Sequence, residues 1–194
     1  MNRVEQEVAY WEDQALGDID RAVCDAGLEG YCFKKLRLPS KGDVLEIGCG
    51  VGRLLLMCPV VKGVTYYGVD CSARMVGEAL RRCKKRRDIR LGLNDGRSFA
   101  EKWRETFEYV YSIAVFQHID DEGVFDYLEE INRVLDDKGK FTLQFVVGEE
   151  KTAFSWQRGI GELGYLFLKA GLRIDEMEAD DIMPNWVFVH GGVL

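Results

Sequence analysis

The stretch Asp43–Arg53 restricts the possible fold more than any other part of this sequence. It reads D-V-L-E-I-G-C-G-V-G-R and opens with an apolar run long enough for a buried strand. Glycine then occupies every second position, at 48, 50 and 52, and the apolar run 51–57 suits a helix. A strand, a tight glycine turn and a helix allow a backbone to approach a ligand closely, with helix N–H groups directed at it. The stretch therefore predicts a ligand-binding turn.

Asp70 is the next acidic residue that ends an apolar run, and it follows Gly52 by eighteen residues. At about this distance a second parallel strand delivers a carboxylate to a ribose. The glycine spacing differs from the dinucleotide fingerprint G-x-G-x-x-G, because the third glycine comes one residue early and Arg53 stands in its place. An NAD-dependent oxidoreductase is therefore disfavoured.

Apolar periodicity predicts alternating strands and helices along the chain. Helices are expected over 2–16, 19–36 with an interruption near 27–30, 73–86, 121–134 and 160–170, with a short one that Pro59 ends. Strands are expected over 44–47, 65–69, 89–93, 107–113, 140–147 (after a turn at 136–139), 172–177 and 186–190. Such alternation predicts a doubly wound, mostly parallel α/β sheet. The last two strands have no helix between them, so the seventh should be antiparallel.

The motif E-x-G-x-G-x-G, the D-x-S of Asp70-Cys71-Ser72 and the segments that follow resemble the class I S-adenosylmethionine (SAM)-dependent methyltransferases. The resemblance extends from about Val44 to Phe145. It implies SAM as the cofactor and the seven-stranded, Rossmann-like methyltransferase fold, in which the last strand inserts between the fifth and the sixth. Residues 1–40 precede the motif, where this family commonly places helices that cover the active site like a lid.

By this resemblance, the turn 48–52 would hold the methionine and ribose portions of SAM. Asp70 would accept hydrogen bonds from both ribose hydroxyls, Asp95 would meet the adenine amino group, and Glu46 would act electrostatically near the ammonium end. Ser98 stands where the family motif D-G-x-D-L has a second acidic residue, so the adenine contact is less well defined than the ribose contact. The implied cofactor-binding residues are Glu46, Gly48, Cys49, Gly50, Gly52, Arg53, Asp70, Cys71, Ser72, Met75, Asp95, Gly96 and Arg97.

The methyl acceptor would bind beyond the fourth strand. Methyl transfer from a sulfonium needs mainly alignment, and it needs a general base only where the nucleophile carries a proton that is not acidic. His118 is the candidate for that base, but its string V-F-Q-H-I resembles small-molecule methyltransferases in which this histidine often shapes the pocket, and we favour that role. The candidate substrate contacts are Tyr10, Trp11, Phe116, Gln117 and Trp156. For Tyr10 and Trp11, core packing is the favoured alternative to a lid contact.

Composition narrows the class of protein. The 194 residues are 47% apolar, which suits one domain over 1–194. The sequence has neither an apolar run of the ~18 residues that a membrane span requires nor the apolar core of a signal peptide, so we expect a cytoplasmic protein. Six scattered cysteines without a C-x-x-C pair, and only two histidines, argue against a metal site or a disulfide framework.

The net charge of −7 conceals one basic cluster, Arg81–Arg87, at the end of a predicted helix. Outside this cluster the sequence has 20 basic and 33 acidic residues. A mostly acidic surface does not suit nucleic-acid binding, and positive charge at a helix C-terminus is favourable by itself.

Together these features predict a SAM-dependent methyltransferase that transfers a methyl group to an oxygen or nitrogen of a small molecule by in-line displacement. We expect a monomer or homodimer that binds neither nucleic acid nor membrane. Two alternatives stay open. One is an enzyme directed at protein or RNA, with the basic cluster as its docking patch. The other is a SAM-fold subunit that binds a partner and does no chemistry.

Overall fold

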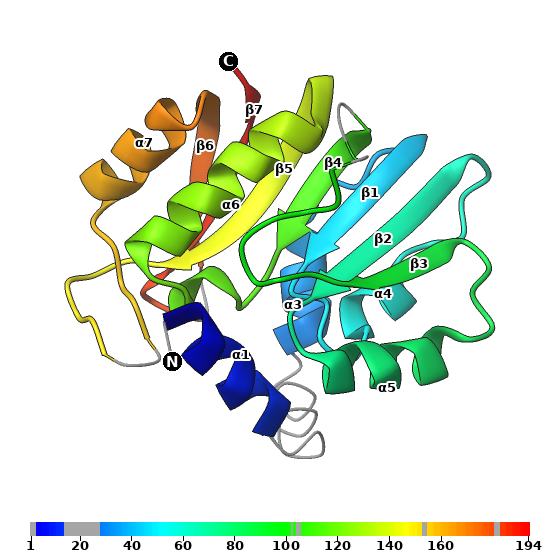
Figure 1. Cartoon of the computed structure of the whole chain (residues 1–194). Coiled ribbons are helices and arrows are strands. Elements are labelled where there is room, and N and C mark those ends of the chain that lie inside the picture. The colour runs from blue at the N-terminus through cyan, green and yellow to red at the C-terminus, as the bar shows by residue number, and fades with distance from the viewer. Residues whose placement is uncertain (1–2, 14–27, 102, 104–105, 153–154, 181–182) are drawn as a thin grey trace.

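A seven-stranded sheet forms the centre of the molecule, with strand order β3-β2-β1-β4-β5-β7-β6 (Figure 1). The computed structural model describes residues 3–13, 28–101, 103, 106–152, 155–180 and 183–194. The strands are β1 (Gly42–Ile47), β2 (Val64–Asp70), β3 (Ile89–Leu93), β4 (Phe107–Ser112), β5 (Leu135–Val146), β6 (Leu172–Ala179) and β7 (Trp186–Val193). The four pairings that do not involve β7 are all parallel, and β7 runs antiparallel to both of its neighbours, β5 and β6. The predicted sheet, including the insertion of its last strand, is confirmed.

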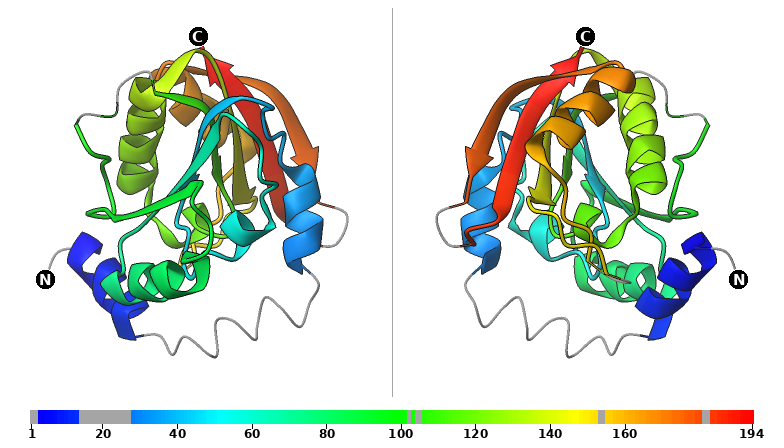
Figure 2. Two further views of the ribbon diagram at one scale, coloured as in Figure 1. Left: turned by 90° about the vertical axis from the view of Figure 1, so that its right-hand side faces the viewer. Right: turned by 90° about the vertical axis from the view of Figure 1, so that its left-hand side faces the viewer.

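Helices cover both faces of this sheet, as a doubly wound fold requires (Figure 2). One face carries α6 (Asp121–Val134) and α7 (Ile160–Lys169), whose apolar residues join the larger core cluster. The other carries α3 (Leu28–Lys35), α4 (Arg53–Met57) and α5 (Ala73–Cys83) around a second, smaller cluster. Two further elements, α1 (Arg3–Asp13) and the 3₁₀ helix η1 (Phe116–His118), lie at the end of the sheet where β1, β2 and β4 terminate.

Short polar caps place the helices at this end of the sheet. Ser72 Oγ accepts a hydrogen bond from the Met75 backbone N–H at 3.1 Å, so α5 begins two residues after β2 ends. Asp120 Oδ1 accepts from the Gly123 N–H at 2.8 Å and starts α6 in the same way. The expected stop of α4 is also observed, since the helix ends at Met57, ahead of Pro59.

Some predicted boundaries need correction. The first helix is observed over Arg3–Asp13, and the prediction for 14–27 lies outside the described residues. Helix α3 continues through Gly30, where we expected an interruption. The turn expected at 136–139 is part of β5, because Leu135 already pairs with Phe107 and a register shift absorbs the irregular residues before Lys140. Helix α5 ends at Cys83, so only the first part of the basic cluster is helical.

The basic cluster carries acidic partners of its own. Arg81 forms an ion pair with Glu78 at 2.5 Å, and Arg86 pairs with Asp88 at 2.7 Å through two parallel hydrogen bonds. These contacts neutralise part of its charge. Within the described part of the chain, every helix is too short or too polar to cross a lipid bilayer.

Candidate active site

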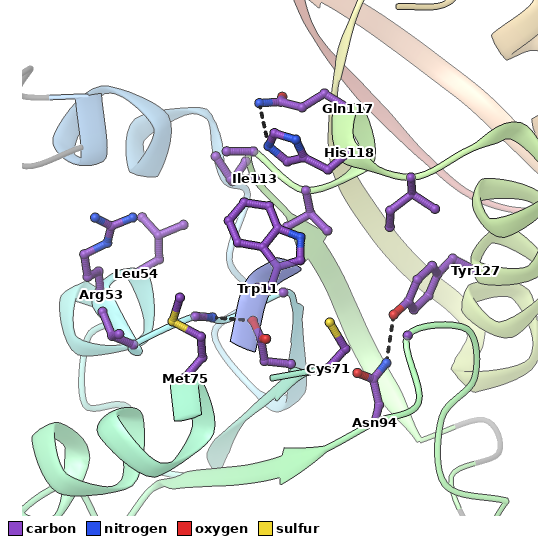
Figure 3. A pocket seen from close by; sticks show the side chains of 18 of the residues that line it. Trp11, Arg53, Leu54, Cys71, Met75, Asn94, Ile113, Gln117, His118 and Tyr127 are labelled. Atoms are coloured by element: carbon purple, nitrogen blue, oxygen red, sulfur yellow. Dashed lines mark hydrogen bonds between the residues drawn. The ribbon is translucent and has the colours of Figure 1, made fainter. Parts of the chain in front are cut away.

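A pocket of about 390 Å³ opens at the carboxyl ends of β1, β2 and β4, where ligands bind in open α/β sheets (Figure 3). Ten residues predicted as site residues line it: Trp11, Gly48, Gly50, Arg53, Asp70, Cys71, Met75, Gly96, Gln117 and His118. Eleven others line it that the sequence analysis did not select: Val8, Cys32, Val51, Leu54, Asn94, Ile113, Ala114, Val115, Ile119, Tyr127 and Trp186. Nine predicted residues lie outside the lining: Tyr10, Glu46, Cys49, Gly52, Ser72, Asp95, Arg97, Phe116 and Trp156.

The glycine turn presents its backbone to the pocket. Gly48 has a φ of 70°, a left-handed conformation, and a Cβ at this position would lie 2.2 Å from Val115 Cγ2. Glycine is therefore required here both by backbone conformation and by the close approach of the opposite wall. Gly52 has a different role, because it faces α5, where an added Cβ would lie 3.0 Å from Cys83 Sγ.

The Asp70 carboxylate is held at the edge of the pocket by two backbone donors. The Gly50 N–H donates to its Oδ2 at 2.8 Å, and the Ser72 N–H donates to its Oδ1 at 2.9 Å. Burial raises the pKa of Asp70, and these two hydrogen bonds oppose that rise. Each oxygen keeps acceptor capacity beyond these bonds, which suits a ligand with two neighbouring hydroxyl groups. Ser72 itself is fully buried as the cap of α5, so its backbone orients Asp70 from behind.

Glu46 lies behind the turn and does not line the pocket. Its side chain is buried, and the hydroxyl of Tyr111 donates to its Oε2 at 3.1 Å. Burial raises the pKa of Glu46 to about 8, while the bond from Tyr111 lowers it. A carboxyl group that is mostly protonated, and so uncharged, at physiological pH therefore lies directly beneath the glycine turn.

The turn after β3 brings a different residue to the pocket than the sequence indicated. Asp95 is exposed, and its carboxylate accepts hydrogen bonds from within its own turn, whereas its neighbours Asn94 and Gly96 line the pocket. Arg97 points to the start of α6 and forms an ion pair with Asp120 at 3.2 Å. At this turn Asn94 and Gly96, and not Asp95, line the pocket.

The opposite end of the pocket is formed by α1 and η1. Trp11 packs edge-on against His118, with ring centroids 5.0 Å apart, and Gln117 Nε2 lies 3.4 Å from His118 Nε2. Trp11 thus reaches the pocket, in contrast to the core packing we favoured, while Tyr10 packs against Trp11 and stays outside. Phe116 is also corrected. It was expected at the rim, but it is fully buried and stacks on Phe145.

Arg158 holds the η1 wall in place and was missed by the sequence analysis. Its guanidinium is 1% exposed and donates to the carbonyls of Phe116 at 3.0 Å and Ile119 at 2.6 Å. It also pairs with Asp121 at 2.9 Å. The backbone N–H of Trp156 donates to the backbone carbonyl of Gln117 at 2.7 Å, so Trp156 supports the same wall without lining the pocket. No local signal in the sequence links these residues, because Arg158 follows η1 by forty positions.

Ala114 is a second missed feature of this wall. It has a φ of 61°, a conformation that costs a non-glycine residue energy and that often marks functional sites. The buried side chain of Gln144 on β5 accepts a hydrogen bond from the Ala114 N–H at 2.8 Å and secures this conformation.

Comparison with known proteins agrees with this geometry. Residues 44–139 match the family model described as a methyltransferase domain. The chain is 30% identical over 179 residues to a cyclopropane-fatty-acyl-phospholipid synthase of Escherichia coli strain K12. That match covers 92% of this chain but 44% of the synthase, so the chain spans less than half the length of this relative.

Solved structures share the whole fold. The chain is similar to a SAM-dependent methyltransferase from Aquifex aeolicus, with a TM-score of 0.75 at 16% identity over 94% of this chain and 100% of the other. It is also similar to the DhpI–SAH complex, with a TM-score of 0.76 at 16% identity over 98% of this chain and 96% of the other.

Proposed function

The chain belongs to the class I SAM-dependent methyltransferases, and we propose that its pocket binds SAM and transfers the methyl group to an oxygen or nitrogen of a small molecule. The observation that carries this proposal is the Asp70 carboxylate, oriented by the Gly50 and Ser72 N–H groups beside a glycine turn in left-handed conformation. These groups fit the cofactor, because a carboxylate with spare acceptor capacity suits the two ribose hydroxyls and the open turn gives the backbone access to the methionine portion.

Bound SAM supplies an activated methyl group on a sulfonium that can be transferred by in-line displacement. The chain's own residues would provide alignment and exclude water. Asp70 anchors the ribose, and the backbone of Gly48 and Gly50 contacts the methionine portion. Trp11 closes the pocket over His118, and Gln117 with His118 supplies the polar side chains that orient an acceptor.

The acceptor end of the pocket supports a small, largely apolar substrate. Its walls come from apolar side chains such as Val8, Ile113 and Trp186. The similarity to a cyclopropane-fatty-acyl-phospholipid synthase is consistent with a substrate of this kind. We propose that His118 acts as a pocket wall and is not required as a base. Acidic partners on either side of the basic cluster disfavour an RNA substrate, because they compete with phosphate for Arg81 and Arg86.

Calorimetric titration with SAM and S-adenosylhomocysteine (SAH) tests the cofactor assignment. Asp70→Ala should weaken binding by roughly 1.5–3 kcal/mol, the range for hydrogen bonds to a charged group. Asp175→Ala is the matched control, since this exposed carboxylate pairs with Lys140 and Arg173 far from the pocket. Equal affinity of wild type and Asp70→Ala, or tighter binding of NAD than of SAM, would refute the proposal.

The acceptor requires an unbiased experiment. The protein would be incubated with methyl-labelled SAM and a cell extract, and the label would then be separated into metabolite, protein and RNA fractions. We expect label among the metabolites. Label confined to protein or RNA would establish the corresponding alternative, and SAM binding without any labelled product would identify a catalytically silent SAM-fold subunit.

A further inference from the structure

The turn after β3 uses the carboxylate of Asp95 for its own structure. Asp95 Oδ1 accepts hydrogen bonds from the Arg97 N–H at 2.9 Å and the Ser98 N–H at 2.7 Å, and its Oδ2 accepts from Ser98 Oγ at 2.8 Å. Burial alone would raise the pKa of Asp95, but these bonds outweigh it and the pKa is lowered. A carboxylate so engaged, exposed and outside the pocket lining, is poorly placed to recognise a bound base.

Asn94, the preceding residue, faces the pocket with a fixed amide. Its backbone N–H donates to the Asp70 carbonyl at 3.0 Å, which ties it to the ribose-binding strand end. Its Nδ2 donates to the Tyr127 hydroxyl at 2.8 Å and toward the Ser98 carbonyl at 3.4 Å. A carbonyl oxygen can only accept, so the amide nitrogen must point to this side. The Asn94 Oδ1 therefore points the other way, toward Cys71 and the pocket (Figure 3), and it accepts no hydrogen bond from the residues that the structure describes.

Tyr127 provides a rigid hydroxyl next to this amide. Its ring is 4% exposed and packs against Phe99 and Phe116, with centroids 5.7 and 5.9 Å away. Burial raises the pKa of Tyr127, so the hydroxyl keeps its proton. The oxygen accepts the bond from Asn94, and among the described residues the hydroxyl hydrogen has no acceptor. The pair thus offers the pocket one acceptor and one donor side by side.

We propose that Asn94 and Tyr127, and not Asp95, recognise the base of the cofactor: Asn94 Oδ1 accepts from the exocyclic amino group of adenine, and the Tyr127 hydroxyl donates to a ring nitrogen. This inference rests on the proposed binding of SAM. Adenine carries a donor amino group beside an acceptor nitrogen, whereas hypoxanthine carries a carbonyl oxygen beside an N–H. The pair therefore selects adenine and rejects hypoxanthine, because both polar contacts become mismatched.

The test compares the binding of SAH with that of S-inosylhomocysteine, its hypoxanthine counterpart, by titration calorimetry. Wild type should prefer SAH by about 30-fold or more, as expected for two mismatched polar contacts. Asn94→Ala should weaken SAH binding by about tenfold and reduce the preference by the same factor, leaving about threefold from the Tyr127 contact. Tyr127→Phe preserves the ring packing and should reduce the preference by about threefold to tenfold. It also keeps the test valid if Asn94→Ala does not fold, which thermal unfolding would reveal.

Asp95→Asn is the matched control, because it keeps an acceptor oxygen for the turn and removes only the charge. Its preference for SAH should equal that of wild type. Loss of the preference in Asp95→Asn, or an unchanged preference in both Asn94→Ala and Tyr127→Phe, would overturn the assignment while leaving SAM binding intact. Absence of SAH binding to wild type would instead overturn the proposed function, and this assignment with it.

Discussion

The two ends of the pocket are built in opposite ways. The part of the cofactor end that lies beside β2 uses backbone groups and one carboxylate from two neighbouring segments, 48–50 and 70–75, and short hydrogen bonds hold them together. The end beneath α1 uses side chains from α1, α3, η1 and the start of β7, which lie far apart in the sequence. The first end depends on backbone conformation and the second on long-range packing. The cofactor end should therefore resist side-chain changes that alter the acceptor end.

The two ends nevertheless meet at one contact. Gly48 belongs to the glycine turn, and Val115 belongs to the segment between β4 and η1, yet there is no room between them for a single methyl group. A change at this contact should disturb both ends at once. Four predictions test how far the two ends are separate, in order of the effect expected.

The largest effect concerns the buried carboxyl group beneath the cofactor end. Burial raises the folded-state pKa of Glu46 from 4.5 to about 8, so its neutral form contributes stability that is fully present below pH 4.5 and is lost as the pH rises through about 8. Glu46→Gln stays neutral at every pH. The free energy of unfolding of Glu46→Gln should therefore rise relative to that of wild type as the pH increases from 4.5 to about 8. Above pH 8 the difference should be on the order of 4 kcal/mol. Urea unfolding from pH 4.5 to 9 measures this, and a constant difference across that range would contradict it.

The next effect concerns the support of the acceptor end. Arg158→Met should lower the free energy of unfolding by about 3 kcal/mol, because the buried carbonyls of Phe116 and Ile119 lose their donor. Lys151→Met is the matched control. Lys151 pairs with the same Asp121 but is partly exposed, so its loss should cost less than about 1 kcal/mol. We expect the SAM affinity of folded Arg158→Met to stay close to wild type. A parallel loss of SAM affinity would show that the two ends are not separate.

The third prediction addresses the contact between the ends. Gly48→Ala and Gly50→Ala both place a side chain at positive φ, which should lower the free energy of unfolding by about 1–2 kcal/mol in each variant. Only Gly48→Ala also collides with Val115, whereas a Cβ at Gly50 meets nothing within 4 Å. Gly48→Ala should therefore be less stable than Gly50→Ala by about 2 kcal/mol, the typical cost of overpacking. Thermal and urea unfolding of the two variants decide this, and equal stabilities would refute the close contact.

The smallest effect concerns His118. If it is a wall, His118→Ala should raise the substrate KM by about tenfold through lost packing against Trp11, with kcat changed much less and SAM affinity unchanged. The kinetic constants of His118→Ala and His118→Asn, once a substrate is known, provide the measurement. A thousandfold fall in kcat with intact SAM binding would instead identify His118 as a general base.

This difference between the ends also explains what the sequence could predict. The sheet order, the antiparallel last strand and the N-cap at Ser72 follow from periodicity, connection length and local capping, and all are observed. Asp70 and the glycine turn were recognisable because their spacing is local. Asn94 was missed because the neighbouring carboxylate of Asp95 is the stronger signal. Tyr127 reads as one more apolar residue on α6, and only the folded structure brings it to Asn94.

Arg158 is a residue of the site whose role the sequence could not reveal. A single arginine after a loop reads as a surface charge, and its burial depends on three carbonyl groups that only the folded chain brings together. For Trp11 the sequence favoured the core over a lid contact, and the structure places it at the pocket, because an aromatic side chain on an amphipathic helix suits either position.

The insertion of β7 between β5 and β6 also governs the order of folding events. Strand β6 pairs with β7, and the outer edge of β5 pairs with β7 as well. The hairpin of β6 and β7 can form locally, but the edge of β5 stays unsatisfied until a segment from 186–193 reaches it across the intervening helix α7. Closing so long a loop is slow relative to helix formation, and an open strand edge favours association with other chains while it lasts. We therefore expect the docking of β7, which completes the sheet, to be the step at which refolding and aggregation compete.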